Sequence, residues 1–292
     1  MSFQYGGQAV IEGVMMRGPD HRAVAVRRPD ATIVIDEKPV GSLTRRFAFL
    51  KLPFVRGVVM LFESLMMGLE ALAFSAEQAA GEEPEEKISK WEMFLTIAFS
   101  LGLAILLFIV IPTALTYYTA AAIQDNFIRN LVEGAIRLLI FLGYVAGVAR
   151  LPDIRRVFMY HGAEHKVINA YEAGGRLTVE EVQKFSTLHP RCGTSFLLIV
   201  ILIKVVIFSG VTASGLFGQI FFRILLLPVV AGVAYELLKL SGKYQDRGLC
   251  RIFIAPGLWL QKLTTREPDD SQVEVAIKAF KAVRKEGDIN VS

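Results

Sequence analysis

Two histidines and a glutamate lie within five residues near the middle of the chain. His161, Glu164 and His165 form the pattern His-x-x-Glu-His. If the stretch is helical, imidazoles four residues apart share one face and can hold one divalent metal ion at about 2.0–2.1 Å. Glu164 could then orient or deprotonate a water molecule at that metal. The pattern has the inverzincin order of the zincin signature, and the alternative interpretation is a solvated polar helix face.

A second pair of candidate ligands follows this motif. His189 and Cys192 are three residues apart, and Pro190 between them favours a turn. Neutral imidazole together with thiolate would favour zinc. A closed set of three histidines and one cysteine would be structural, whereas an open position would be catalytic. The alternative for Cys192 is a small hydrophobic residue before a membrane helix, which is also how we interpret Cys250.

Glu236 is the rival third ligand. Inverzincin-like sites take a carboxylate from a later helix, and Glu236 stands near the end of the last long apolar segment. The alternative is a charge pair of Glu236 with Lys239 or Lys243 at the membrane interface. The sequence leaves both interpretations open.

The composition indicates a membrane protein. Of the 292 residues, 53% are hydrophobic, and the mean hydropathy is +0.45, which is too apolar for an ordinary soluble domain. The net charge is only +4, so nucleic-acid binding is not expected. Two cysteines do not make a disulfide framework. Residues 1–18 lack the charged and apolar regions of a cleavable signal peptide.

Four apolar segments are long enough to cross a bilayer, because about 20 residues of helix span about 30 Å of hydrocarbon. The segments are residues 93–111, 131–149, 194–209 and 216–238. Pro112 is expected to end the first of them.

The basic residues predict how these segments are oriented. Lysine and arginine are frequent before the first segment, in the loop 150–193 and after the last segment, and rare in the two other loops. This alternation predicts a multi-pass protein of the inner or plasma membrane with both termini cytoplasmic. All the candidate ligands then lie at one depth on the cytoplasmic side, namely His161, His165, His189, Cys192 and Glu236.

Ionisable residues interrupt the apolar segments at four positions, which are Glu133, Arg137, Lys204 and Arg223. Such residues are costly in a membrane and usually face the interior of the bundle in pairs. Glu133 is expected to pair with Arg137 or Arg223, whereas Lys204 has no obvious partner and could bind a lipid phosphate or line a cavity. The functional interpretation is a polar path for a substrate or ion, and the alternative is that these groups only hold the bundle together.

The remaining segments are expected to be peripheral. Residues 1–43 should form a β-rich unit with strands in 8–16, 23–27 and 32–35. Residues 44–90 combine an amphipathic helix over 55–79, either interfacial or packed on the bundle, with a charged linker. The region 91–240 contains the membrane helices. In 241–292, an interrupted apolar segment at 249–263 precedes a C-terminal helix that begins near 268–270 and ends at Gly287.

Four separated motifs resemble those of one family. They are His-Gly-Ala-Glu-His-Lys at 161–166, His-Pro-Arg-Cys-Gly-Thr-Ser-Phe at 189–196, the glycine-rich stretch at 6–18, and Thr-Thr-Arg-Glu-Pro-Asp-Asp at 264–270. The chain resembles the YqhQ-like family of bacterial membrane proteins over nearly its whole length. The resemblance implies a multi-pass membrane protein, in a family described both as a domain of unknown function and as predicted metal-dependent enzymes.

Together these observations predict a mainly α, polytopic membrane protein with four transmembrane helices, a small N-terminal β unit and cytoplasmic amphipathic helices. The leading hypothesis is a metal-dependent, hydrolase-like enzyme with Glu164 as its catalytic base and a divalent metal, expected to be Zn²⁺, at the cytoplasmic face. The alternative is a non-enzymatic scaffold or assembly factor with a structural metal site. A transporter is a weaker third hypothesis, because no internal repeat is visible. The expected partners are the lipid bilayer, a cytoplasmic substrate or protein of unknown identity, and further copies of the chain.

Overall fold

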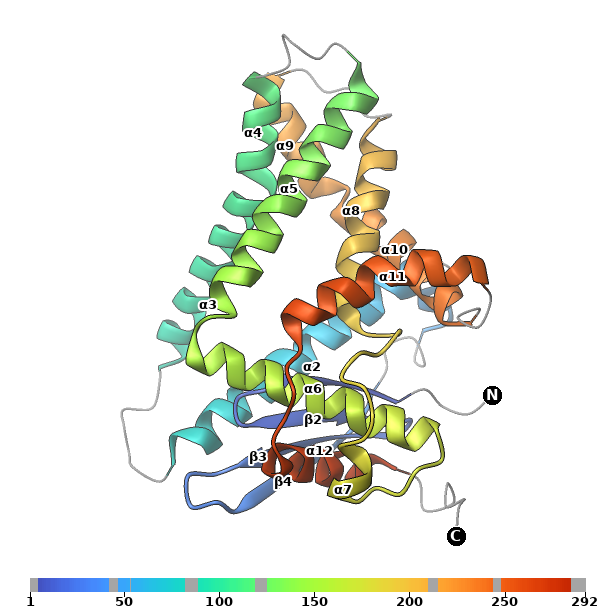
Figure 1. Ribbon diagram of the computed structural model, residues 1–292. Helices are drawn as coiled ribbons and strands as arrows, with labels where there is room; N and C mark the ends of the chain where they lie inside the picture. The colour runs from blue at the N-terminus through green and yellow to red at the C-terminus, as the bar shows by residue number, and fades with distance from the viewer. Residues whose placement is uncertain are drawn as a thin grey trace.

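The computed structural model describes residues 5–41, 47–52, 54–81, 89–118, 125–209, 215–243 and 248–284. Long helices form one end of the molecule, and a small sheet with its own helices forms the other (Figure 1). The predicted mainly helical architecture with an N-terminal antiparallel sheet is confirmed.

The N-terminal unit is a four-stranded antiparallel meander, in the order β1 (Gly6–Val10), β2 (Gly13–Arg17), β3 (His21–Arg27) and β4 (Ile33–Pro39). A hairpin or three strands were expected, and the single strand expected over 8–16 is wrong. The chain reverses at Ile11 and Glu12, so that Val10 pairs with Gly13. Glu12 has a φ of 49°, and its carbonyl accepts a hydrogen bond from Arg27 at 2.8 Å, which holds the turn.

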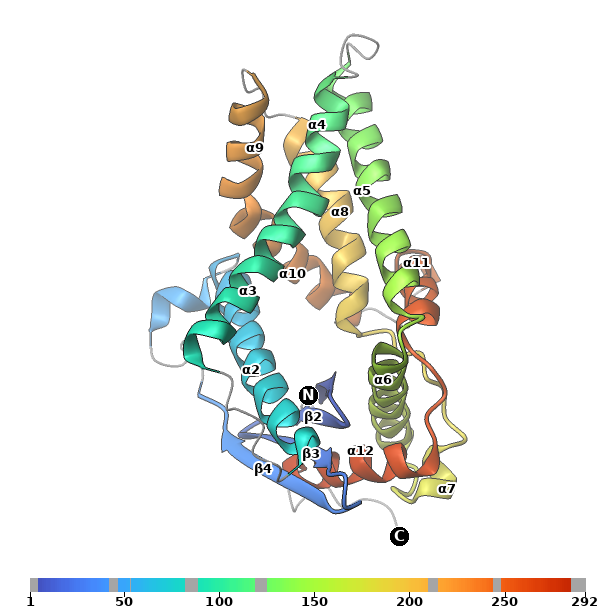
Figure 2. The same ribbon diagram turned by 90° about the vertical axis from the view of Figure 1, so that its left-hand side faces the viewer.

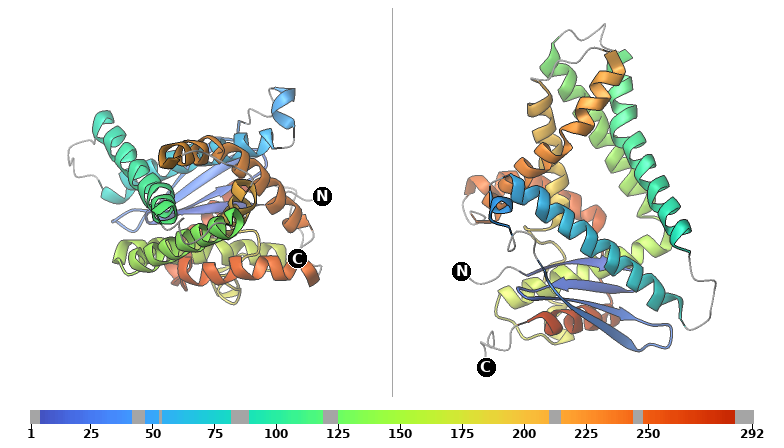
Figure 3. Two further views of the ribbon diagram at one scale, coloured as in Figure 1. Left: turned by 90° about the horizontal axis from the view of Figure 1, so that it is seen from above. Right: turned by 180° about the vertical axis from the view of Figure 1, so that it is seen from behind.

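Helices cover both faces of the sheet (Figure 2). α6 (Pro152–Glu172) and α12 (Asp270–Val283) lie on one face, and α2 (Val55–Ala80) lies on the other (Figure 3, left). Successive strand residues point to opposite faces, so one strand supplies both cores. On β2, Val14 and Met16 pack towards α6 and α12, whereas Met15 packs towards Ala71 of α2. The N-terminal unit therefore packs on other elements, as the sequence predicted.

α2 combines contacts to the sheet with an exposed apolar face. The sequence predicted an interfacial helix or one packed on the bundle, and the structure places it against the sheet and against α10 (Leu227–Lys243). At the second contact, a Cβ on Gly57 would lie 2.9 Å from Tyr235, so only glycine permits this approach. Phe62 and Leu65 are more than half exposed on the outer face. α2 is itself long and apolar enough to cross a membrane.

The first expected apolar segment continues beyond Pro112, so the prediction that Pro112 ends it is wrong. α3 (Lys90–Ile105), the π-helical turn η2 (Leu106–Val110) and α4 (Ile111–Tyr118) follow one another without a break. Proline has no N–H for the carbonyl four residues earlier, which is that of Phe108. The Phe108 carbonyl accepts instead from Arg137 Nε at 2.5 Å, and Ile111 N–H donates to Leu106, five residues back.

The remaining long helices are α5 (Asn126–Val148), α8 (Gly193–Ser209), α9 (Gly215–Leu225) and α10. α9 and α10 meet at an angle of 43°, so the expected fourth segment is bent. Among the described residues, three helices have the length and composition to cross a membrane: α2, residues 94–118, and α5. The number is up to four if the bent pair counts as one span. α8 has a shorter apolar stretch, Ile199–Phe208.

Short helices and the C-terminal part complete the fold. η1 (Ala48–Lys51) precedes α2, and α7 (Val179–Val182) follows α6. α11 (Gly248–Thr264) is one helix with Pro256 inside it, so the interruption expected at 256–257 is wrong. α11 packs against α8. α12 begins as expected, with an Asp269 capping box, but it ends at Val283 because Arg284 is extended, so the end expected at Gly287 is wrong.

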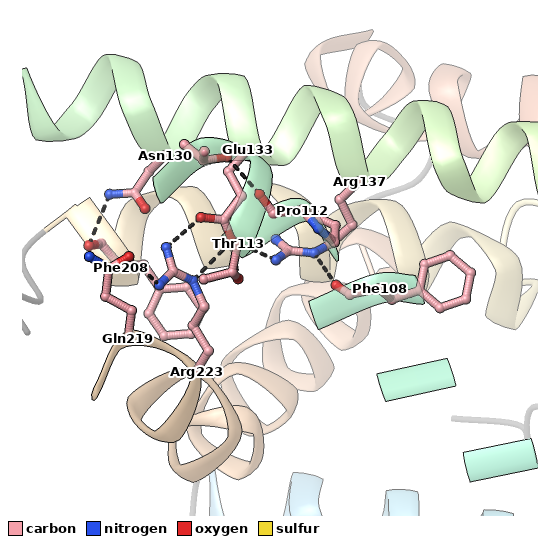
Figure 4. A network of polar contacts seen from close by, with 10 residues as sticks. Phe108, Pro112, Thr113, Asn130, Glu133, Arg137, Phe208, Gln219 and Arg223 are labelled. Carbon is pink, nitrogen blue, oxygen red and sulfur yellow. Dashed lines mark hydrogen bonds and ion pairs between the residues drawn. The ribbon is translucent and has the colours of Figure 1, made fainter. Parts of the chain in front are cut away.

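One buried carboxylate connects three of the long helices (Figure 4). Glu133 of α5 receives Arg137 from its own helix at 2.6 Å, and Arg223 of α9 contacts it through Nε at 2.9 Å and also through Nη2. Thr113 of α4 lies 3.3 Å from the same carboxylate. Both pairings that the sequence offered for Glu133 are therefore present.

We predict that Glu133→Gln lowers the free energy of unfolding by about 3–5 kcal/mol, because it leaves two buried guanidinium groups without their anion. Thermal or denaturant unfolding of the purified protein in detergent measures the change. The matched control is Glu181→Gln, which breaks an exposed pair with Lys184 and should cost less than about 1 kcal/mol. Equal effects of the two substitutions would contradict a structural role for Glu133.

Candidate metal centre

The His-x-x-Glu-His motif lies in the middle of α6, in the helical conformation that its spacing requires. Pro152 occupies the first turn, where its missing N–H has no intrahelical partner to lose, and Asp153 complements the positive end of the helix dipole. The alternative of a solvated polar face does not describe this helix, because Glu164 is 5% and His165 2% exposed. The motif faces the interior of the protein.

Three candidate ligands come together at this point. His161 and His165 stack along α6 with ring centroids 4.4 Å apart. Cys192, just before α8, places its Sγ 3.3 Å from His161 Nε2. One ligand atom from each of the three residues lies within 4.8 Å of the other two. The chain thus joins the helical pair to a residue about 30 positions later.

Backbone carbonyls orient both imidazoles. His161 Nδ1 lies 2.8 Å from the carbonyl of Thr264, and His165 Nδ1 lies 2.6 Å from that of Thr187. A carbonyl can only accept, so Nδ1 carries a proton in each ring, and in the neutral ring the free lone pair is on Nε2. Metal-binding histidines are typically held in this way, with one nitrogen donating to a carbonyl and the other free for the ion.

This donor set fits zinc. Two imidazole nitrogens and a thiolate are ligands that zinc prefers, and three protein ligands leave one tetrahedral position open. Burial lowers the pKa of His165 well below its ordinary value, and the neighbouring charge of His161 lowers it further. His165 is therefore neutral at physiological pH, as metal binding requires.

Glu164 lies beside these ligands without belonging to the group of three. Burial raises the pKa of Glu164 to about 7. The charge of His161 opposes this rise, the charge of Cys192 adds to it, and a hydrogen bond from the Gly7 backbone N–H again opposes it. The contact with Gly7 brings β1 to the site, where a Cβ on residue 7 would come within 3.1 Å of the Glu164 carboxyl carbon.

His189 lies close by and points elsewhere. Its ring centroid is 5.7 Å from that of His165, and its Nε2 is 3.5 Å from Glu172. Gln261 of α11 holds the backbone of His189, donating to its carbonyl at 2.8 Å and accepting its N–H at 2.9 Å. Burial lowers the pKa of His189 to about 4. The turn expected at 189–192 is present, since Cys192 N–H donates to the His189 carbonyl.

Glu236 is engaged by α2 rather than by the histidines. Arg56 donates to both of its carboxylate oxygens, through Nε at 2.6 Å and through Nη2. Glu236 is thus part of a charge pair at the contact between α2 and α10. The sequence had offered Lys239 or Lys243 as the partner, and the side chains of both lie outside the described part of the chain.

The segment 264–266 crosses α6 at the motif, a contact that we did not predict from the sequence. Arg266 N–H donates to the carbonyl of Phe158 at 2.9 Å, and a Cβ on Gly162 would lie 2.0 Å from the Arg266 carbonyl oxygen. Only glycine at position 162 permits this crossing, which also brings the Thr264 carbonyl to His161. The glycine inside the motif was the available indication of a close backbone approach.

The fold and the site define a mainly helical protein with membrane-length helices and a buried histidine–cysteine cluster below them. A family model described as "Protein of unknown function (DUF1385)" matches residues 52–286, and the chain belongs to this family. It is 39% identical over 288 residues to the "Uncharacterized protein YqhQ" of Bacillus subtilis (strain 168), an alignment that covers 94% of this chain and 91% of the relative. No solved structure matches the chain significantly.

We predict that Gly162→Ala destabilises the protein by about 1–3 kcal/mol or more, because the new methyl group must displace the Arg266 backbone. Thermal unfolding in detergent measures the loss. Gly143→Ala is the matched control, since a Cβ there meets no atom within 4 Å and alanine is the better helix former by about 1 kcal/mol. Equal stability of the two variants would be incompatible with the crossing at residue 162.

Proposed function

We propose that this protein is a metal-dependent hydrolase of the bacterial cell membrane that acts at the cytoplasmic surface. The observation that carries the proposal is the joint placement of ligand atoms of His161, His165 and Cys192 beside the buried carboxylate of Glu164. Cysteine near two correctly oriented imidazoles favours zinc among the divalent metals.

The membrane location rests on the long apolar helices. Phe99, Leu139 and Val206 are each about 70% exposed on α3, α5 and α8, which is unfavourable in water and suits lipid. The excess of lysine and arginine in the loop 150–193 assigns the site to the cytoplasmic side. α6 begins four residues after α5 ends, and α8 begins directly after Cys192. In this proposal the site lies next to the ends of α5 and α8, close to the bilayer surface.

The residues around the ligands have separate roles in this proposal. His161, His165 and Cys192 would hold the ion, and Thr264 and Thr187 keep the two imidazoles in the ligating tautomer. Bound there, zinc would polarise a substrate carbonyl and make a water molecule acidic near neutral pH. Glu164 would accept the proton of that water as general base, with its carboxylate held by the Gly7 N–H. A peptide or lipid-linked substrate near the membrane surface fits this position.

A structural metal site in a membrane scaffold is the second candidate, and the position of His189 favours it. With its ring 5.7 Å from His165 and its side chain buried, His189 could close the coordination shell. The protein would then bind a cytoplasmic partner without turnover. A partner that is retained by Glu164→Gln and lost by His165→Ala would favour this candidate.

We expect the purified protein to contain about one zinc ion per chain. The double substitution His161→Ala with His165→Ala should abolish this zinc, because it removes two of three ligands. Elemental analysis by mass spectrometry measures the metal content. His21→Ala, which removes an exposed histidine of β3, is the control and should keep the metal. Zinc retained in full by the double variant would refute the site.

We expect Glu164→Gln to keep its zinc and to hydrolyse substrate at least about 100-fold more slowly, since it removes the general base and preserves the shape of the side chain. A library of membrane-anchored peptides and lipid-linked esters, incubated with the zinc-loaded protein, provides the assay. Glu181→Gln should be as active as the wild type. Absence of turnover by the wild type, together with a closed four-ligand site, would leave the scaffold as the better account.

A further inference from the structure

A second polar group lies far from the metal centre, inside the long helices. Glu133, Arg137, Lys204 and Arg223 are each more than nine-tenths buried. Two arginines contact the one carboxylate and Lys204 adds a third positive charge, which leaves a net charge of +2 among these four residues. Buried charges are normally paired, because an isolated one is strongly disfavoured in a low dielectric.

The hydrogen bonds show which donors are already used (Figure 4). Arg223 directs Nε and Nη2 to Glu133 and Nη1 to Gln219. Arg137 directs Nη2 to Glu133 and Nε to the Phe108 carbonyl. Both arginines thus form ion pairs with the one carboxylate, as expected for side chains that hold helices together. Arg137 Nη1 remains without an acceptor in the described part of the chain.

Lys204 is not explained by this network. Among the residues that the structure describes, no group accepts a hydrogen bond or forms an ion pair with its ammonium. Lys204 is only 7% exposed, so most of its side chain is enclosed by the helices, unlike that of a surface lysine. Glu133, Arg137 and Arg223 are its charged neighbours, and two of these three side chains have the same sign as Lys204.

Close packing of α5 and α8 keeps this arrangement in place. A Cβ on Gly134 would lie 2.9 Å from Val205, so the two helices approach closely beside Glu133 and Lys204. Lys204 and Arg137 therefore stand on two closely packed helices, where like charges in a buried site repel each other. An anion between Lys204 Nζ and Arg137 Nη1 would use both remaining donors and remove the repulsion.

We propose that the helical bundle binds a phosphate-class oxyanion through Lys204 and Arg137. Arginine and lysine are the side chains that proteins use for phosphate, and two donors from adjacent helices match an oxyanion with several acceptor oxygens. The source is either free phosphate or the headgroup of a phospholipid. A dianion would neutralise the group, and a phosphodiester would leave a charge of +1. This proposal is independent of the metal centre, which uses none of these residues.

The test measures the thermal midpoint of the full-length protein with two probes. The first is inorganic phosphate, added to protein in neutral detergent at constant ionic strength, with chloride as the matched salt. The second is phosphatidylglycerol in nanodiscs, compared with phosphatidylcholine. At saturation, the wild type should gain at least about 3 °C from one of the probes. Lys204→Met should lose that gain, whereas Lys184→Met, at an exposed lysine of the sheet end, should keep it.

The outcomes separate the two sources. A Lys204-dependent gain with phosphate identifies a free oxyanion, and one with phosphatidylglycerol alone identifies a lipid headgroup. The absence of any gain in the wild type, or a gain that Lys204→Met keeps in full, would overturn the proposal. If Lys204→Met does not fold, Lys204→Gln replaces it under the same criteria. Failure of both variants to fold would show that the ammonium is needed for packing alone, which also overturns the proposal.

Discussion

The burial of α6 is the constraint on which the rest of the structure depends. The helix is enclosed by the sheet, by α12 and by the segment that crosses it at Gly162. The side chains of His165 and Lys166 are buried, and an unpaired polar group there would cost about 1–3 kcal/mol. Carbonyls of neighbouring segments satisfy them: Lys166, for example, donates to Gln183 and Phe185 at 2.8 Å.

Hydrogen bonds to backbone carbonyls also orient the proposed metal ligands. The carbonyls of Thr187 and Thr264 satisfy His165 and His161, and by accepting from Nδ1 they leave Nε2 for an ion. The hydrogen bonds that offset the cost of burying the two imidazoles therefore also orient them for metal binding. The sheet takes part as well, because the Gly7 N–H of β1 reaches Glu164. This connection gives the N-terminal strands a role in the site.

Features with a local pattern could be predicted from the sequence. The spacing of His161 and His165 indicated a shared helix face, apolar length indicated the long helices, and short strand-like runs beside turn residues indicated the strands. The rule that proline ends a helix failed at Pro112 and Pro256, because tertiary contacts outweighed a local preference. At Pro112 the orphaned carbonyl of Phe108 found Arg137, 29 residues later. No local pattern contains that contact.

Contacts between distant segments could not be predicted in the same way. Thr264 lies 103 positions after His161, and Arg266 meets Gly162 only because α11 and the chain after it return across α6. The predicted membrane topology put Cys192 and Glu236 on the same side as the histidines, yet their side chains meet different partners. Cys192 contacts His161, whereas Glu236 pairs with Arg56 of α2. Membrane topology predicts how deep a residue lies relative to the bilayer, but it does not predict which side chains contact one another.

X-ray absorption at the zinc edge of the purified protein would test the central claim most directly. The account predicts one sulfur at about 2.3 Å and at least two imidazole nitrogens at about 2.0–2.1 Å from the ion. In Cys192→Ser the sulfur contribution should disappear, while the imidazole contribution remains. A bound zinc ion with no sulfur neighbour in the wild type, or an unchanged spectrum in Cys192→Ser, would contradict the assignment of His161, His165 and Cys192 as the metal centre.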